Sequence, residues 1–131
     1  MFQGVITAII TPFNENGDID EPALRQLVNF QIESGVAGIV PCGTTGESPT
    51  LSYEEHNRVI DIVIEEARGR VPIIAGTGSN STAEAIFLTQ HAYKAGAQAT
   101  LQVAPYYNKP TQKGIYQHFL TIADSVDLPM I

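Results

Sequence analysis

Three short segments carry small and hydroxyl-bearing residues of the kind that bind small molecules. The first, Gly43–Ser48, contains two glycines, which let the backbone turn sharply and approach a ligand, and the hydroxyl groups of Thr44 and Thr45. The second is 76–80 (Gly-Thr-Gly-Ser-Asn) and the third is 105–110 (Pro-Tyr-Tyr-Asn-Lys-Pro). Taken alone, each segment is equally typical of a tight turn whose threonine or serine caps the following helix.

Apolar runs alternate with amphipathic stretches along the chain. The apolar runs predict strands at 4–11, 36–41, 71–75, 100–104 and from 128 onward, and the amphipathic stretches predict helices at 22–34, 52–68, 81–95 and 111–126. This alternation is typical of a parallel sheet with helices outside it. Each of the three segments follows a strand, so all three should meet at one edge of the sheet, where α/β folds bind small molecules.

The ends of the expected helices have recognisable signals. Ser52 with Glu55, and Ser81 with Glu84, match the pattern of a capping box, in which two side chains satisfy the first free backbone N–H groups of a helix. Three glycines then stand where helices should stop, because glycine readily takes the left-handed conformation. These are Gly35, Gly69 and Gly96.

Length, charge and cysteine content narrow the class of protein. The 131 residues are 44% hydrophobic, which suits about one globular domain, and the formal net charge is −7. A chain this acidic is a poor partner for nucleic acid or an anionic membrane. Cys42 is the single cysteine, so no internal disulfide forms and a reducing, cytoplasmic location is expected.

A closed (β/α)₈ barrel needs about 250 residues, roughly twice this length. The chain stops inside an apolar run, at Leu128–Ile131. We therefore expect residues 1–131 to be the N-terminal half of one such barrel domain, covering the first four βα units and the start of strand 5. A self-contained flavodoxin-like sheet is the alternative, and it would need a different strand order and a closing helix.

Segments 43–47 (Gly-Thr-Thr-Gly-Glu) and 106–110 (Tyr-Tyr-Asn-Lys-Pro) together resemble the dihydrodipicolinate synthase family. The similarity runs through the whole chain. The first segment is shared with a wider superfamily that includes N-acetylneuraminate lyase and 2-keto-3-deoxy sugar-acid aldolases, so either of these is the alternative enzyme. The second segment is the more specific mark of the synthase.

The resemblance implies a lyase of the Schiff-base, class I aldolase type that acts in lysine and diaminopimelate biosynthesis. Such an enzyme is a (β/α)₈ barrel, usually a homotetramer built as a dimer of dimers. It condenses pyruvate with L-aspartate-4-semialdehyde through a lysine imine and uses no cofactor. No metal is expected either, because His56, His91 and His118 lie far apart in the sequence without metal-ligand spacing.

The resemblance also implies roles for individual residues. Thr45 and Gly43 would bind the pyruvate carboxylate, Thr44 would belong to a proton relay, and Tyr107 would complete that relay from a neighbouring subunit. The second relay tyrosine and the imine lysine would lie beyond Ile131.

The lysines within the chain are Lys94, Lys109 and Lys113. None is expected to have the desolvated pocket that a catalytic amine requires, since two fall in or near helices and the third falls in a segment that, as the resemblance implies, serves for subunit contact. Residues 1–131 alone should therefore be inactive.

Some relatives in the family are inhibited by lysine. Ser48, His56, Asn80, Glu84 and Tyr106 match the positions that bind it, and Glu84 would face the lysine ammonium group. The structural alternative is that Glu84 completes a capping box and that His56 lies on a solvated helix face.

A non-catalytic half-barrel module, which pairs with a second copy to close a barrel, is the hypothesis from a different class of function. Cys42 directly precedes the Gly43–Ser48 segment, but it is expected to be a small buried packing residue rather than a nucleophile.

Overall fold

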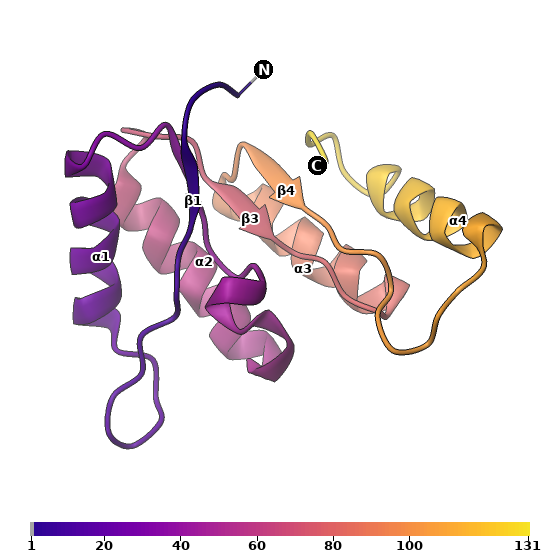
Figure 1. Ribbon diagram of the computed structural model, residues 1–131, viewed down its shortest axis with the longest axis horizontal. Helices are drawn as coiled ribbons and strands as arrows, with labels where there is room; N and C mark the ends of the chain where they lie inside the picture. Colours follow the sequence, from indigo (N-terminus) through magenta and orange to yellow (C-terminus); the bar gives the residue numbers. More distant parts are fainter. Residues whose placement is uncertain (1) are drawn as a thin grey trace.

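Parallel strands run side by side in chain order at the centre of the computed structural model, which describes residues 2–131 (Figure 1). The pairs β1–β2 and β3–β4 are both parallel. A parallel bridge between Ile39 and Ile73 joins β2 to β3, and another between Thr100 and Met130 places the end of the chain beside β4. The strands are β1 (Ile6–Ala8), β2 (Gly38–Val40), β3 (Ile74–Gly76) and β4 (Ala99–Leu101).

This order confirms the predicted parallel sheet and excludes the flavodoxin-like alternative. In a flavodoxin-like sheet the first strand lies between the second and the third. Here β2 contacts β3 directly through Ile39 and Ile73. Residues 129–131 begin the expected fifth strand, because Thr100 donates a backbone hydrogen bond to Pro129 and accepts one from Ile131, each at 2.9 Å.

The helices begin at the caps that the sequence offers. Asp20 accepts a hydrogen bond from the Ala23 N–H, and Ser52 and Glu55 form a complete, reciprocal capping box. Thr111 accepts from the Gly114 N–H at the start of the last helix. The helices are α1 (Glu21–Glu33), α2 (Tyr53–Ala67), α3 (Thr82–Ala95) and α4 (Gln112–Ala123).

Three sequence expectations need correction. Each strand is three residues long, because strand ends are set by the partner strand rather than by the extent of an apolar run. The turn after α2 is made by Arg68, which takes the left-handed conformation at φ 50° before Gly69. Glu84 does not complete a capping box, since its carboxylate accepts a hydrogen bond from the Ser79 hydroxyl at 2.8 Å instead.

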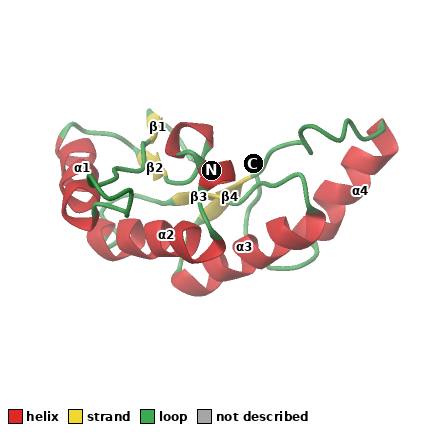
Figure 2. Cartoon of the chain, turned by 90° about the horizontal axis from the view of Figure 1, so that it is seen from below, coloured by secondary structure: helices red, strands yellow, loops and turns green. Residues whose placement is uncertain are grey.

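The four α-helices lie on one side of the strands (Figure 2). The main core fills the space between the two layers, where Ile39, Ile73 and Ala75 of the sheet region meet Ile60 and Val63 of α2. These side chains are at most 2% exposed. Burying several branched side chains of this size supplies the largest part of the stability of such a layer.

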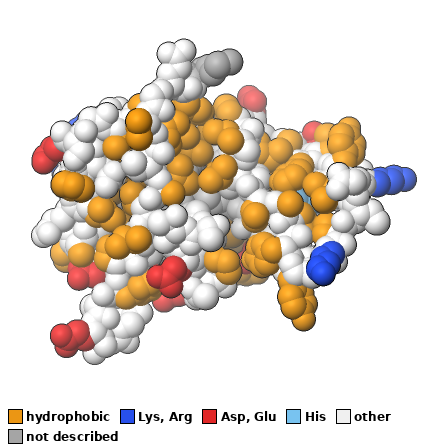
Figure 3. All heavy atoms as spheres, in the orientation of Figure 1, with side chains coloured by type: hydrophobic (Ala, Val, Ile, Leu, Met, Phe, Trp, Pro, Cys, Tyr) orange, Lys and Arg blue, Asp and Glu red, His pale blue; other side chains and the backbone are white. Residues whose placement is uncertain are grey.

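The opposite face of the strands is also apolar. A second cluster contains Val40, Ile74 and Ala99, with Ile6 and Leu101 packed at its edge. No α-helix of the described chain covers this face, and Figure 3 shows apolar side chains gathered over the strands. A parallel sheet is normally covered on both faces, so this face lacks its usual partner layer.

Within residues 2–131, no helix has the length and apolar character required to cross a membrane. The same residues contain no group of three or more His, Cys, Asp or Glu side chains placed to hold a metal ion.

Candidate functional site

A cavity of ≈ 390 Å³ lies at the C-terminal ends of β2, β3 and β4. All three segments singled out in the sequence contribute to its wall. Their convergence confirms that they share one edge of the sheet. The lining residues are Cys42, Gly43, Thr44, Ser48, Pro49, Gly76, Gly78, Leu101, Gln102, Val103 and Tyr106.

Two glycines allow the strand ends to come close enough to form this cavity. A Cβ atom added to Gly76 would lie 2.2 Å from the carbonyl oxygen of Cys42. A Cβ atom added to Gly78 would lie 2.4 Å from the backbone nitrogen of Val103. Both contacts are with backbone atoms, which cannot rotate away, so the close approach of these segments depends on glycine at both positions.

The Gly43–Ser48 segment forms a single helical turn over the end of β2. Its short 3₁₀ helix spans Thr44–Gly46. The first residues of such a turn present N–H groups that the turn itself cannot satisfy. The hydroxyl of Thr11 donates to the Gly46 carbonyl at 2.7 Å, and this buried bond fixes the turn to the segment that follows β1.

The two threonines of the turn are placed differently. Both are exposed, but Thr44 lines the cavity and Thr45 lies outside the lining. Glu47 closes the turn in the left-handed conformation at φ 60°. A non-glycine residue in this conformation costs roughly 1 kcal/mol or more, which the surrounding contacts must offset.

The segment between β4 and α4 holds two tyrosines in different environments. Tyr106 lines the cavity, and its carbonyl accepts a hydrogen bond from the Asn80 side-chain amide at 3.3 Å. Tyr107 is 94% exposed and does not line the cavity. Tyr107 and Lys109 both have positive φ, at 69° and 45°. Strained backbone of this kind is concentrated at functional sites, so this segment is a candidate for one.

The five residues that match a lysine-binding site do not all reach the cavity. Ser48 and Tyr106 line it, and Asn80 is attached to it through the Tyr106 carbonyl. Glu84 is anchored nearby by its bond to Ser79. His56 is 2% exposed, so the expectation that it lies on a solvated helix face is wrong.

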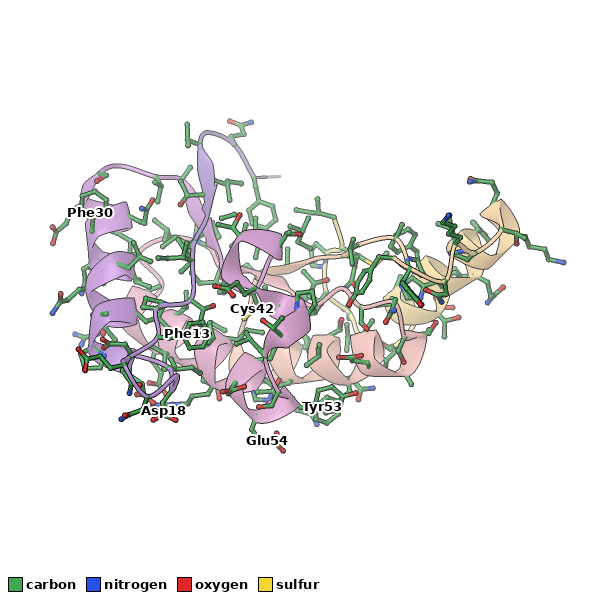
Figure 4. All side chains as sticks on the ribbon, turned by 60° about the horizontal axis from the view of Figure 1, so that its bottom comes forward. Phe13, Asp18, Phe30, Cys42, Tyr53 and Glu54 are labelled. Carbon is green, nitrogen blue, oxygen red and sulfur yellow. The ribbon has the colours of Figure 1, made fainter. Side chains whose placement is uncertain are left out.

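Cys42 lines the cavity and contacts the buried His56, and neither side chain is suited to chemistry at neutral pH. The Cys42 thiol donates to the His56 carbonyl at 3.7 Å, and burial raises the pKa of the thiol well above its usual range. Burial lowers the pKa of His56 to about 4, and a nearby backbone group of Gly76 offsets only part of this effect. Figure 4 shows Cys42 in the interior, while Tyr53 and Glu54 lie at the surface. Cys42 is therefore a packing residue, as predicted.

Lys94, Lys109 and Lys113 are all exposed, and none of them lines the cavity. An imine-forming lysine needs a desolvated environment that lowers its pKa. Residues 2–131 offer no lysine in such an environment, in agreement with the sequence expectation.

Sequence reasoning missed the contribution of Gln102 and its neighbours. The Gln102 amide donates to the hydroxyls of Thr77 at 2.7 Å and of Thr89 at 3.1 Å, and these hydroxyls are themselves 2.9 Å apart. Gln102 itself lines the cavity, so this polar cluster ties the end of β4 to α3 at the cavity wall. A glutamine within an apolar run gives no sequence signal that its partners lie 13 and 25 residues away.

Comparison with known proteins adds an independent line of evidence. The Dihydrodipicolinate synthetase family model matches residues 1–131. The chain is 66% identical to a 4-hydroxy-tetrahydrodipicolinate synthase of Syntrophus aciditrophicus over 131 residues, which are 100% of this chain and 45% of that protein. It thus spans about half the length of the curated relatives that it matches.

Solved structures give the same picture. A chloride-inhibited dihydrodipicolinate synthase from Acinetobacter baumannii, complexed with pyruvate, has a TM-score of 0.97 at 55% identity, over 99% of this chain and 45% of that one. The synthase of Cyanidioschyzon merolae with lysine bound has a TM-score of 0.95 at 45% identity, over 98% of this chain and 44% of that one. Because the family model matches all 131 residues of this chain, the chain belongs to the dihydrodipicolinate synthetase family.

Proposed function

We propose that this chain is the N-terminal half of a single (β/α)₈ barrel that acts as a 4-hydroxy-tetrahydrodipicolinate synthase. The sequential order of the parallel strands supports a barrel, since each strand neighbours the next one in the chain. The buried cluster of Val40, Ile74 and Ala99 lies on the face that no α-helix of the described chain covers, and this face would be the barrel interior. The missing strands would then be supplied by the other half of the protein.

The proposed reaction condenses pyruvate with L-aspartate-4-semialdehyde in lysine and diaminopimelate biosynthesis. A lysine amine of the second half would attack the pyruvate carbonyl, releasing water and forming an imine. The enamine derived from it would then form a carbon–carbon bond with the aldehyde. The observation that carries the proposal is the convergence of Thr44, Gly76 and Tyr106 on one cavity at the strand ends, in a chain whose relatives bear the synthase name.

Within this cavity, Gly43 and Thr45 would bind the pyruvate carboxylate. The N–H groups at the start of the Thr44–Gly46 turn suit an anion, because they lack partners within the turn. Thr45 lies outside the lining of this half alone, so its hydroxyl would reach the substrate only in the completed barrel.

Thr44 and Tyr107 would act in a proton relay, since hydroxyl groups can donate and accept without carrying a charge. Tyr107 does not line the cavity of its own chain and is 94% exposed. This placement supports a role in the site of a neighbouring subunit. The active form would therefore be a homotetramer built as a dimer of dimers, in which the closer pair exchanges these tyrosines.

We further propose lysine as a feedback inhibitor that binds at Ser48, Asn80, Glu84 and Tyr106. Glu84 provides a carboxylate for an ammonium group, and Asn80 is bonded to the backbone of the tyrosine segment. His56 is the fifth matching residue; its ring is buried and its carbonyl contacts Cys42, so it would support this site rather than touch the ligand. A cytoplasmic location fits a protein whose one cysteine is unpaired.

The test is reduction with borohydride in the presence of pyruvate, followed by intact mass measurement. The protein made from the complete gene should gain one reduced pyruvate adduct per chain, and residues 1–131 alone should gain none. Turnover of aspartate-4-semialdehyde, compared with N-acetylneuraminate and 2-keto-3-deoxy sugar acids, then separates the synthase from its superfamily alternatives. Absence of an adduct on the complete protein would contradict the proposed function and favour a non-catalytic module.

A further inference from the structure

Helix α4 is held against the rest of the chain by few buried side chains. Of its residues, His118 and Ile122 are the buried ones, at 5% and 0% exposure. Ile122 supplies apolar contact, which is not directional. His118 supplies the directional part of the attachment, so its partner determines where along α3 the helix α4 sits.

That partner is Thr82, the first residue of α3. The Thr82 hydroxyl and His118 Nδ1 are 2.8 Å apart, across 36 residues of sequence. The other ring nitrogen, Nε2, is buried and has no partner within residues 2–131. A buried ring with one unsatisfied nitrogen is costly, so the bond to Thr82 is the one polar contact that offsets its burial.

The bond joins α3 to α4, the helix that follows the segment carrying Tyr106 and Tyr107. This segment leaves β4 at Leu101 and enters α4 at Gln112. One attachment fixes its middle, where Asn80 donates to the Tyr106 carbonyl. Thr82 lies two residues after Asn80, so both attachments start from the same end of α3 and hold the segment at two points.

We propose that the Thr82–His118 hydrogen bond is a positioning device that fixes α4, and through it the Tyr106–Lys109 segment, in the geometry that the reaction requires. This inference rests on the proposed function of Tyr107. Neither Thr82 nor His118 touches the cavity, so both are positioning residues. Burial lowers the pKa of His118, which agrees with a neutral ring held by a neutral hydroxyl.

A positioning role predicts a specific effect on the kinetic constants. Displacement of a relay group by about 1 Å can slow a reaction by up to about 100-fold without weakening substrate binding. Loss of the bond should therefore lower kcat and leave the KM for pyruvate nearly unchanged. A general loss of folding would instead reduce the number of working sites.

The experiment uses two matched pairs of variants in the protein made from the complete gene. Thr82→Val removes the hydroxyl and keeps the shape, while Thr82→Ser keeps the hydroxyl. His118→Leu removes the ring nitrogen, while His118→Asn keeps a polar atom at the position of Nδ1. The kcat is expressed per site that pyruvate and borohydride can label, and amide hydrogen exchange is measured over residues 104–111.

We expect Thr82→Val and His118→Leu each to lower kcat per labelled site by about 10-fold, with pyruvate KM within about twofold of wild type. Amide exchange in 104–111 should accelerate in the same two variants. The double variant should be no worse than either single one, because both remove the same bond. Thr82→Ser and His118→Asn should restore both properties.

If Thr82→Val and His118→Leu have the same kcat and the same amide exchange rates as the wild-type protein, the proposal is wrong. Equal damage in the two restoring variants would also overturn it, because side-chain volume rather than the bond would then be responsible. If the wild-type protein forms no pyruvate adduct, the proposed function fails, and the exchange rates alone decide whether the pair holds the segment.

Discussion

Replacing Gly76 by alanine should strongly destabilise the protein, because it adds a methyl group where two backbone segments of the cavity wall are already in close contact. The new Cβ would lie 2.2 Å from the Cys42 carbonyl oxygen and 2.7 Å from the Gly43 nitrogen. The two segments would have to separate by roughly 1 Å, which a close-packed interior cannot absorb locally. The movement would also strain the bond from the Gly76 N–H to the Pro41 carbonyl, now 2.9 Å.

The expected loss is about 3 kcal/mol of unfolding free energy, at the upper end of the range for overpacking, because the opposing atoms belong to the backbone. Gly43→Ala is the matched control. Gly43 lines the same cavity at φ −76°, and the nearest atom to its added Cβ is Val40 Cγ1 at 3.7 Å. This variant should lose less than about 0.5 kcal/mol.

The assay is urea unfolding followed by circular dichroism, at one protein concentration because association contributes to stability. Pyruvate labelling should be weakened in Gly76→Ala. If Gly76→Ala is as stable as wild type, or if the two variants lose stability equally, the glycine contact is not what holds the cavity wall together.

Three individual residues give further predictions. Burial lowers the pKa of His56 to about 4 in the folded state, so as the pH falls from 6.5 to 4 the unfolded state binds a proton that the folded state does not, and the free energy of unfolding should fall by about 3 kcal/mol. Urea unfolding at stepped pH should show a smaller fall in His56→Leu. An equal fall in the variant would contradict this assignment. Arg68→Gly should raise stability by about 0.5–1 kcal/mol, because glycine relieves the strain at φ 50°, and a lower melting temperature would argue against that strain. Tyr107→Phe should leave the melting curve unchanged, since the side chain is 94% exposed, and lower kcat by about 100-fold if the relay proposal is right; an unchanged kcat would remove Tyr107 from the relay.

The type and order of the elements were predictable because each rests on short-range patterns. Ser52 and Thr111 cap helices as their local sequence indicates, and Gly96 ends α3 in the left-handed conformation. The strand limits were not predictable. A strand ends where its partner stops pairing, and no property of a single apolar run contains that information.

The same distinction between local patterns and distant contacts applies to the residues of the site. Gly43, Thr44 and Tyr106 belong to segments with unusual local composition, and this composition alone distinguishes them from the rest of the chain. The contacts that hold those segments in place are pairs of distant residues with ordinary local sequence. Thr11 bonds to the turn 35 residues away, and His118 bonds to Thr82 across 36 residues.

Glu84 shows why a local interpretation can fail even where it has a good pattern. The Ser81–Glu84 spacing fits a capping box, yet the Ser79 hydroxyl competes for the same carboxylate and binds it at 2.8 Å. Ser79 also accepts from the Ser81 N–H, the donor that Glu84 would otherwise have satisfied. One hydroxyl thus replaces the carboxylate in the cap and holds that carboxylate at Ser79, the residue before Asn80, which bonds to the Tyr106 carbonyl. A Ser79→Ala variant would therefore return Glu84 to the helix cap, which links the local cap chemistry to the availability of this carboxylate for a ligand.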